Sequence, residues 1–548
     1  MKRRVISRTI TVLIALAVGV GFLASVTETA EARVNNDVGL GTPAALNQPM
    51  CDKETGRWKV QYYGIGPCTR PFEQGENNGG ATAQGVTKDE ILIVALIPPA
   101  AGDLSSMNGG IKNQATGANG RSANAVMDDD AILAYAYNLW GRTFKYEFVT
   151  STGSDEAAQR ADALAVLAKK PFGVIDLASL APAGQNGGGQ FFDQAIASAG
   201  VPANPQPLTT AETYAPYAQI TAEFVAKNAS KGNAVYAGDA LKNTKRKLGV
   251  IYPSGANGVD VEDLTKTLTK YGAKVDAENI VSFTVPTDST QVAASVQQQA
   301  PTLIAKLKDN GVTTIIHLGI GPTQTTAFTT AATANDFFPE WVQGGNGYID
   351  LDFFARNFDK EQWAHAFGPV WFTPSVTGGA PDTITAWFQW YWGTTQGTHS
   401  PGVLALIRRI YDGVALAGPN LTKKTFNAGQ QKFPPVGGAY SGMITNLEAS
   451  YVTPALTQRI GTAIGWWNPN VSGNSNQVPI TGQGKYMYLD GGKRFAIGKY
   501  PKNVKLFDPS NSIAFLDAIP ESDKVGPYTC EKCPSTGGGQ QPSSVASA

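Results

Sequence analysis

The sequence predicts an α/β protein built from two parallel sheets, and two observations carry this prediction. The first is Ile91 to Ile97, an unbroken apolar run rich in β-branched residues that stops at Pro98-Pro99. Such a run is typical of a strand buried on both faces of a parallel sheet. The second is the alternation of strand and helix patterns in two successive series, which is typical of right-handed βαβ units. At 548 residues, the chain has room for two or three domains.

The first series runs from the strand at 91–97 to Gly200. The helix expected over 155–169 is acidic at its start and basic at its end, as the helix dipole favours. The other expected elements are helices over 122–139 and 190–198, strands over 144–149 and 172–177, and a strand edge at Val201-Pro202. This order predicts a parallel sheet with helices on both faces.

The second series begins at Lys245 and repeats the same pattern. Its expected strands are 247–252, 274–283, 313–318 and 340–344, and its expected helices are 258–271, 291–310 and 323–335. Farther along, 361–373 is expected to cross between the lobes, 401–417 to form a buried helix, and 486–495 to form a hairpin around Asp490-Gly491. Two similar lobes with no linker between them predict a cleft between lobes.

The loop after the first strand is long and rich in hydroxyl groups, and it contains Ser105 and Ser106. In open α/β sheets, ligands bind beside the carboxyl ends of strands, where such loops lie. The alternative is an ordinary connection between a strand and a helix. The sequence leaves both interpretations open.

The first 32 residues match a secretory signal peptide. A positively charged start, Lys2 to Arg8, precedes an apolar stretch, Ile10 to Ala24, and an A-x-A cleavage pattern at Ala30 to Ala32. We therefore expect a secreted or periplasmic protein whose mature chain begins at Arg33. The alternative is a membrane anchor, although the apolar stretch is shorter than the about 20 residues of a span. No Cys lies near the cleavage point, so no lipid anchor is expected.

The four cysteines form an even set in an exported chain and predict two disulfides. Local pairs, Cys51 with Cys68 and Cys530 with Cys533, are favoured, and pairing between the two ends of the chain is the alternative. Cys530 to Cys533 is also a CxxC, a spacing found in zinc and redox sites, but it stands alone before a low-complexity tail. An extension at 33–84 is expected to pack onto the body, and 521–548 to be a disordered tail.

Composition excludes several classes of function. The 44 Lys and Arg residues are balanced by 44 Asp and Glu residues, so the chain lacks the basic excess of nucleic-acid-binding proteins. The three histidines are scattered, and Asp128 to Asp130 is interpreted as a solvated helix face, so no metal site is expected. His317 ends an apolar strand, where it either reaches the cleft or is a structural residue. Without a GxSxG elbow or a P-loop motif, we expect neither an enzyme nor a bound cofactor.

The order of these pieces resembles the type I periplasmic-binding-protein family, specifically the branched-chain amino-acid-binding-like solute receptors of ABC transporters. The motifs that carry the resemblance are Gly85 to Ile91 (GVTKDEI), Gly153 to Glu156 (GSDE), Phe191 to Pro202 (FFDQAIASAGVP), Lys247 to Pro253 (KLGVIYP) and Tyr411 to Val414 (YDGV). The resemblance implies two Rossmann-like lobes joined by a three-strand hinge and closing on a ligand. The implied bounds are lobe 1 at 85–240 with a returning segment at about 373–450, and lobe 2 at 241–372 with a returning segment at about 451–520.

The resemblance also implies that ligand contacts come from loops at the strand ends facing the cleft. By position, the ligand-binding residues are Ser105, Ser106, Ser179, Tyr252, Ser254, Asn346 and Tyr348. Hydroxyl and backbone N–H groups at helix starts suit an anionic group such as a carboxylate. Amino-acid receptors of this family use a second-lobe carboxylate for the ligand's ammonium group, and here only Asp350 is close. The aromatic residues near the hinge, which either stack on a ligand or pack the hinge core, are Trp341, Tyr348, Trp371 and Phe372.

These features imply a non-catalytic receptor that captures a small molecule and delivers it to an ABC permease in the membrane. The implied ligand is an amino acid, an amide, or an aromatic or apolar carboxylate. We expect a monomer with no cofactor and no nucleic-acid partner. Two alternatives stay open: an exported sensory or scaffold protein on the same bilobal fold, and a secreted hydrolase with a catalytic triad scattered along the sequence.

Overall fold

The computed structural model describes fourteen stretches of the chain. They are 34–62, 65–97, 120–153, 155–178, 189–204, 211–254, 261–286, 291–344, 349–377, 383–393, 401–434, 462–476, 480–518 and 525–536. The predicted signal peptide lies outside the described residues, and the described residues from Val34 onward belong to one compact unit. Within that unit, the described strands include two large sheets, and we call each sheet with its helices a lobe.

The sheet of the first lobe has four parallel strands in the order β4-β3-β5-β6. These strands are β3 (Glu90–Ile97), β4 (Thr143–Thr150), β5 (Gly173–Asp176) and β6 (Ala203–Asn204). The apolar run at 91–97 is the central strand of this sheet, as the sequence predicts. Because successive side chains point to opposite faces of a strand, Val94 and Leu96 face one layer of helices while Ile93 and Ala95 face the other.

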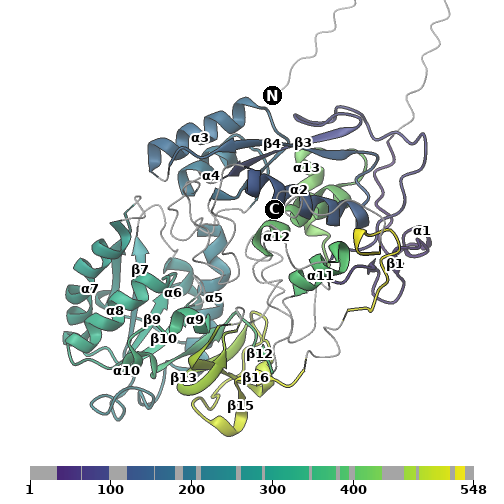
Figure 1. Cartoon of the computed structure of the whole chain (residues 1–548). Coiled ribbons are helices and arrows are strands. Elements are labelled where there is room, and N and C mark those ends of the chain that lie inside the picture. Colours follow the sequence, from purple (N-terminus) through teal and green to yellow (C-terminus); the bar gives the residue numbers. More distant parts are fainter. Residues whose placement is uncertain are drawn as a thin grey trace, which may run out of the picture. The chain divides into compact units, whose positions relative to one another are not determined.

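Helices cover both faces of this first sheet. One layer contains α3 (Glu156–Ala168) and α4 (Gln190–Ser198), which contact Val94 and Leu96. The other layer contains α2 (Gly120–Ala136), α11 (Thr383–Trp392), α12 (Pro401–Ala417) and α13 (Lys423–Gln431). The chain thus returns to the first lobe after passing through the second, and α12 lies against α2 (Figure 1).

The sheet of the second lobe has eight strands in the order β15-β14-β13-β11-β10-β9-β7-β8. Five of them are parallel, namely β7 (Leu248–Ser254), β8 (Ile280–Thr284), β9 (Thr314–Leu318), β10 (Glu340–Gly344) and β11 (Ala366–Val370). The antiparallel strands β13 (Ala463–Asn474), β14 (Thr481–Leu489) and β15 (Ser512–Ile513) extend the sheet beyond β11. A separate pair joins β12 (Ser375–Val376) to β16 (Phe515–Leu516).

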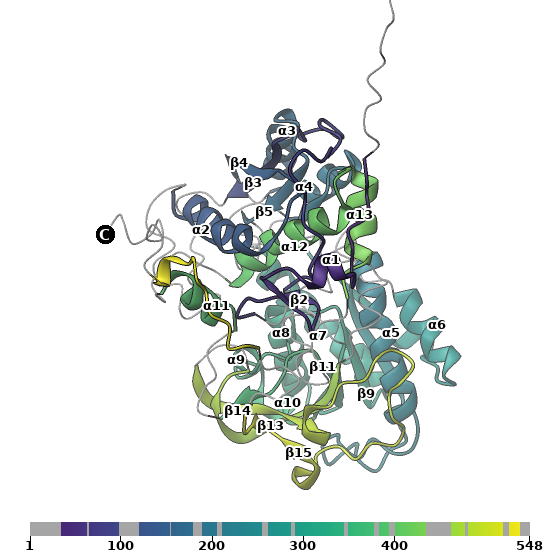
Figure 2. The same ribbon diagram turned by 90° about the vertical axis from the view of Figure 1, so that its right-hand side faces the viewer.

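Helices also cover both faces of the second sheet. On one face lie α5 (Ala211–Asn228) and α6 (Val261–Lys270), which are side by side in Figure 2. On the other lie α7 (Val292–Asp309), α8 (Pro322–Ala334), α9 (Asp352–Ala355) and α10 (Lys360–Trp363). Both lobes therefore have parallel strands between two layers of helices, which confirms the predicted α/β fold class.

The N-terminal extension packs onto the first lobe. It contains α1 (Pro43–Leu46), β1 (Cys51–Asp52) and β2 (Arg57–Trp58), and a disulfide joins Cys51 to Cys68. Arg142 of the first lobe donates to the backbone oxygen atoms of Asn78 (2.7 Å) and Gly80 (3.1 Å). The same guanidinium donates to Pro419 O at 2.9 Å, so one buried side chain ties the extension to the segment after α12.

The predicted hairpin at 486–495 is wrong. Only its first half is a strand, β14, because Asp490 to Gly492 forms a short 3-10 helix that leads the chain out of the sheet. Asp490 does take a left-handed φ of 48°, as a turn requires. However, β13 and β15 already occupy both sides of β14. Among the described helices of eight or more residues, α5, α11 and α13 have no counterpart among the sequence predictions.

Candidate functional site

The candidate site is the set of carboxyl-terminal strand ends in the two sheets, where ligand loops are expected. Of the seven predicted ligand-binding residues, the structure describes two, Tyr252 and Ser254. The other five, which lie outside the described residues, are Ser105, Ser106, Ser179, Asn346 and Tyr348. Their ligand contacts stay predictions.

Tyr252 and Ser254 lie in the carboxyl-terminal part of β7, which runs two residues beyond the strand predicted at 247–252. Tyr252 is half-buried and packs against the core between the second sheet and α5–α6. The Ser254 hydroxyl donates to Phe283 O at 3.2 Å and thus joins the ends of β7 and β8. Next along the sheet edge, Gly319 follows β9, and α8 begins at Pro322 without a side-chain cap on its first turn. The N-terminus of α8 therefore presents backbone N–H groups and a positive dipole end.

In the first lobe, the strand end at β4 is occupied by internal hydrogen bonds. The Asp162 carboxylate on α3 accepts from the Ser151 hydroxyl at 2.7 Å, and from the Thr152 hydroxyl at 2.7 Å and N–H at 3.1 Å. These bonds satisfy a buried carboxylate with neutral donors. They position the loop between β4 and α3 rather than leaving Asp162 free for a ligand.

At the end of β5, two buried carboxyl groups lie close enough for their charges to interact. Asp176 is the last residue of β5 and accepts from Gly189 N at 3.3 Å, and Asp193 is in the first turn of α4. Burial, followed by the charge of Asp176, raises the pKa of Asp193 well above its usual range. Two such groups favour holding a proton between them over carrying two negative charges.

Asp350, the acid considered for a ligand ammonium group, is committed to the backbone instead. Its carboxylate accepts from Trp371 N and from Phe372 N (3.3 Å), where the chain leaves β11. Arg494 donates to Trp371 O at 2.8 Å on the same peptide segment. Burial raises the pKa of Asp350 to about 6, against the lowering effect of these hydrogen bonds. Asp350 therefore positions the segment that exits the second sheet.

The described aromatic residues pack the core. Trp341 is fully buried, and its indole N–H donates to Gln362 Oε1 at 3.0 Å. The ring of Trp371 lies 4.3 Å from the ring of Tyr217 on α5. Trp371 and Phe372 are buried to more than nine-tenths. Of the two interpretations considered for these three residues, their burial favours hinge packing.

His317 is buried in the core of the second lobe. Its ring makes edge contacts with Phe328, Trp341 and Trp363, and neither ring nitrogen has a hydrogen-bond partner in the structure. Burial lowers the pKa of His317 to about 3, so the imidazole is neutral. A structural role is thus favoured over contact with a ligand.

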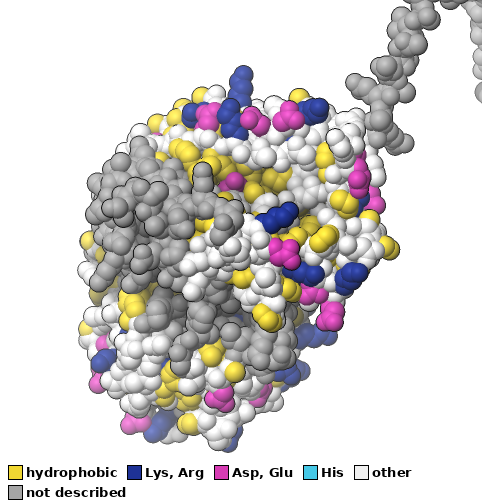
Figure 3. Space-filling model, turned by 45° about the vertical axis from the view of Figure 1, so that its right-hand side comes forward, with side chains coloured by type: hydrophobic (Ala, Val, Ile, Leu, Met, Phe, Trp, Pro, Cys, Tyr) yellow, Lys and Arg dark blue, Asp and Glu magenta, His cyan; other side chains and the backbone are white. Residues whose placement is uncertain are grey.

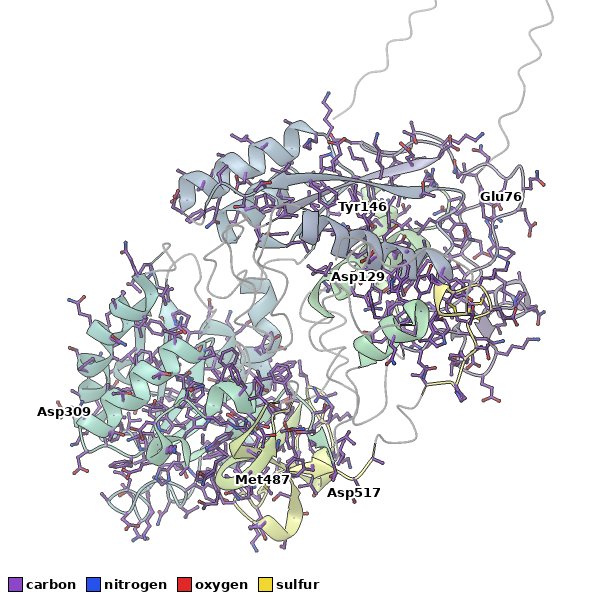
Figure 4. All side chains as sticks on the ribbon, in the orientation of Figure 1. Glu76, Asp129, Tyr146, Asp309, Met487 and Asp517 are labelled. Atoms are coloured by element: carbon purple, nitrogen blue, oxygen red, sulfur yellow. A yellow bond between two sulfur atoms is a disulfide. The ribbon has the colours of Figure 1, made fainter. Side chains whose placement is uncertain are left out.

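The interpretation of Asp128 to Asp130 as a solvated helix face is wrong. Asp128 and Asp129 are buried, and Asp130 Oδ1 accepts from Tyr146 (2.7 Å) and Tyr411 (2.6 Å). Asp129 of α2 and Tyr146 of β4 are labelled in Figure 4. Helical spacing was the missed signal, because Asp129 shares a face with Val126 and Leu133.

Beside this cluster, where the ring centroids of Tyr137 and Tyr411 are 5.4 Å apart, a second set of hydrogen bonds reaches the N-terminal extension. The Tyr137 hydroxyl donates to Asp412 Oδ1 at 2.5 Å and accepts from Gly66 N at 3.0 Å. Arg408 pairs with the other oxygen of Asp412 at 2.7 Å. Asp129 is the exception, since both its oxygens are buried without a partner, and burial and then Asp128 and Asp130 raise its pKa well above the usual range.

Neither a metal cluster nor a membrane span is present in the described part of the chain. No group of three or more His, Cys, Asp or Glu side chains is arranged to hold a metal ion there. Among the same residues, no helix is both long and apolar enough to cross a membrane. On the face shown in Figure 3, positive and negative side chains are interspersed. This mixing agrees with the balanced charge of the sequence.

One surface groove of about 650 Å³ lies between the end of α7 and the end of α8. Its lining includes Lys306, Asp309 and Asn335. Because α7 leads directly into the start of β9, the groove lies at the amino-terminal edge of the parallel strands. It is thus on the opposite edge from Tyr252 and Ser254.

Comparison with known proteins gives similarity at the level of solved structures. No family model matches the chain, and no curated protein matches it. An ABC-transporter solute-binding protein from R. palustris in complex with 4-hydroxybenzoate is 13% identical, with a TM-score of 0.40, over 76% of this chain and 98% of that one. A type 1 periplasmic binding protein from Bordetella pertussis Tohama I is 14% identical, with a TM-score of 0.41, over 74% and 99%. A putative branched-chain amino acid ABC transporter protein from Silicibacter pomeroyi is 14% identical, with a TM-score of 0.42, over 75% and 99%.

Proposed function

We propose that this protein is an extracytoplasmic solute-binding protein. It captures a small molecule between its two lobes and delivers it to an ABC permease. The observation that carries the proposal is the repeated passage of the chain between two parallel-sheet lobes, each with its own helices on both faces. Such an arrangement suits two bodies that move about their connections and close on a ligand held by strand-end loops.

Among the expected ligand classes, the described residues favour a carboxylate. The N-terminus of α8 lies at the predicted ligand-binding edge and lacks both a side-chain cap and an acidic residue in its first turn. Backbone N–H groups at such a terminus attract an anion. The nearby acid that would suit an ammonium group, Asp350, is occupied by Trp371 and Phe372. An aromatic or apolar carboxylate therefore fits these residues better than a free amino acid.

A thermal-shift screen of the chain from Arg33 onward tests the proposal. Aromatic carboxylates, branched-chain amino acids and their amides form separate arms. A ligand that binds only the folded state stabilises it by about 2.7 kcal/mol at a hundredfold excess over its dissociation constant. We expect the aromatic carboxylates to raise the melting temperature most. A flat response from folded protein across all arms would overturn the receptor proposal.

Two matched variants test whether the Tyr252 hydroxyl contacts the ligand. Tyr252→Phe removes a hydroxyl at the predicted edge, whereas Tyr271→Phe removes one beyond the end of α6 on the same lobe. Loss of one ligand hydrogen bond is expected to weaken binding by about tenfold. Isothermal titration should show that loss for Tyr252→Phe alone. Equal affinities in both variants would exclude the Tyr252 hydroxyl from the site.

A further inference from the structure

Part of the segment expected to be a disordered tail, residues 525–536, makes defined contacts with two separate parts of the protein, and we call it the strap. Tyr528 is at the centre of these contacts. Its hydroxyl donates to Asp52 Oδ2 in the N-terminal extension, and its backbone oxygen accepts from the Trp390 indole N–H at 2.7 Å on α11. Gln61 of the extension adds a bond of 2.8 Å to Val525 O. The two ends of the chain are therefore joined without a covalent bond between them.

The disulfide between Cys530 and Cys533 closes a four-residue loop at the end of the strap. Both cysteines are buried, while Glu531 and Lys532 between them are exposed. The hydroxyl of Thr536 links the two ends of this loop, because it donates to Cys530 O (3.1 Å) and Cys533 O (2.8 Å). The disulfide thus fixes the backbone that these bonds need.

The closed loop packs against the end of α11. Ser535 donates to Trp390 O at 2.7 Å, so the strap bonds both the ring and the backbone of Trp390. Gly393 ends α11 with a φ of 76°, and a Cβ there would lie 3.1 Å from Ser535 Cα. Figures 1 and 2 both show the strap beside α11.

The strap lies beside a cluster of aromatic side chains on α11. Trp390 and Tyr391 of α11 make edge contacts with Tyr135 of α2. On the same helix, Trp387 stacks on Tyr62 of the extension, with ring centroids 4.9 Å apart. The N-terminal extension and the strap both cover aromatic side chains of α11. If either segment moves away, part of this aromatic surface becomes exposed to solvent.

We propose that the strap is a redox-operated latch. With Cys530–Cys533 oxidised, the strap lies on α11 and holds the N-terminal extension through Tyr528. Reduction opens the four-residue loop, releases Ser535 and Tyr528 from Trp390, and frees the extension at Asp52. This latch is independent of the proposed solute-binding function.

The chemistry requires a dithiol reductant. One of its thiolates attacks a cysteine sulfur, the Cys530–Cys533 bond breaks, and the other cysteine leaves as a thiolate that takes up a proton. The second reductant thiol then closes its own disulfide and releases the first cysteine. Two electrons and two protons pass to the protein. Because both sulfur atoms are buried, the strap must lift before the first attack.

Hydrogen exchange measured by mass spectrometry tests the latch. The double variant Cys530→Ser with Cys533→Ser leaves Cys51–Cys68 intact. We expect exchange in 383–392 and 50–62 to accelerate by about tenfold or more, while β9 and β10 keep their protection. The control Lys532→Gln alters an exposed side chain within the loop and is expected to change nothing. Unchanged protection at α11 and the extension in the double variant would overturn the proposal.

A second measurement does not depend on folding of the serine variant. Tyr528→Phe keeps both disulfides and removes only the hydroxyl bonded to Asp52. Dithiothreitol is the probe, and alkylated peptides report Cys530–Cys533 separately from Cys51–Cys68. We expect Tyr528→Phe to speed reduction of Cys530–Cys533 by about tenfold, because the strap lifts more often. A rate equal to that of the wild type would show that Tyr528 does not hold the latch.

Discussion

Two buried aspartates, one in each lobe, show opposite solutions to the same problem. Asp352 of the second lobe accepts from Lys485 Nζ (2.7 Å), Asn476 N (2.9 Å) and Tyr486 N (2.8 Å). Asp129 of the first lobe has no hydrogen-bond partner for either carboxylate oxygen in the structure. Both are fully buried. Burial costs each of them solvation, but only Asp352 recovers interactions in return.

The difference in hydrogen bonding shows that Asp352, and not Asp129, holds neighbouring elements together. The partners of Asp352 come from β14 and from Asn476 just beyond β13, and Lys485 also donates to Ser375 of β12 at 2.9 Å. One ion pair thus joins α9 to the antiparallel part of the sheet. In the first lobe, that role falls to Asp130, which holds Tyr146 and Tyr411. Asp129, beside it, is buried on the apolar face of α2, and its carboxylate makes no hydrogen bond with the described residues.

The largest expected effect comes from breaking the buried pair. Lys485→Met leaves the Asp352 charge uncompensated and is expected to cost about 3–5 kcal/mol in the free energy of unfolding. Urea denaturation followed by circular dichroism measures it. Lys505→Met, which removes an exposed lysine, is the control.

The double variant separates charge from packing. Asp352→Asn combined with Lys485→Met removes both charges, so it should cost less than Lys485→Met alone. If the two losses simply add, the pair does not compensate buried charge, and the contrast with Asp129 fails.

His317 provides the basic counterpart of Asp129, with the opposite dependence on pH. Its folded pKa of about 3 is below the unfolded value of 6.5, so its contribution to stability is lost as pH falls below 6.5. The expected loss is about 1.4 kcal/mol per pH unit, or about 3 kcal/mol by pH 4.5. Urea unfolding of wild type and His317→Leu at pH 7.5 and 4.5 measures the difference.

The comparison between variants matters because Asp350 titrates in the same range. Its folded pKa of about 6 is above the unfolded value of 3.8, so its contribution is fully present below 3.8 and is lost as pH rises through 6. The pH dependence of stability from Asp350 is opposite in sign to that from His317. It is the same in wild type and His317→Leu, so it cancels when their free energies of unfolding are subtracted. A pH-independent difference between them would mean that His317 is not buried as a neutral base.

Asp129→Asn is expected to stabilise the protein by about 1–2 kcal/mol at pH 8, because it removes the cost of a buried unpartnered charge. The raised pKa sets the sign: the contribution of Asp129 is present below 3.8 and is lost as pH rises. Unfolding measured at pH 8 and 5 should show the gain shrinking at the lower pH. The same change at Asp352 is destabilising, so a loss at both positions would remove the distinction between the two acids.

The strand and helix pattern was predictable because each lobe alternates buried strands with amphipathic helices. The run at 91–97 and the helix at 190–198 needed only local periodicity. The hairpin at 486–495 failed because its Asp490-Gly491 signal is local, whereas the neighbours of β14 come from β13 and β15. β14 therefore pairs with two strands outside the predicted hairpin, and the local turn signal does not reveal them.

The candidate site was less predictable than the fold. The positions of Tyr252 and Ser254 at the end of β7 follow from the strand pattern, and their ligand contacts stay predictions. Asp350 illustrates what sequence omits, because its bonds to Trp371 and Phe372 depend on where β11 ends. The buried position of Asp129 was visible in its helical spacing, but its charge suggested solvent. The disulfides were the simplest case, since both local pairs form as favoured.

The smallest expected effect comes from an exposed ion pair with the same separation as the buried one. Lys266 Nζ lies 2.7 Å from Glu262 Oε1, as Lys485 Nζ does from Asp352 Oδ2. However, the side chains of Lys266 and Glu262 are 66% and 68% exposed, against 0% for the buried pair. Water screens the exposed charges and hydrates either one after its partner is removed.

Lys266→Ala is therefore expected to change the free energy of unfolding by no more than about 0.5 kcal/mol. Urea denaturation under the conditions used for Lys485→Met gives the ratio of the two effects directly. Raising the salt concentration should reduce the Lys266 effect further and leave the Lys485 effect nearly unchanged, because only exposed charges are screened. Similar losses at the two lysines would mean that burial does not set the cost of an unpaired charge in this protein, and the difference between Asp352 and Asp129 would then need another cause.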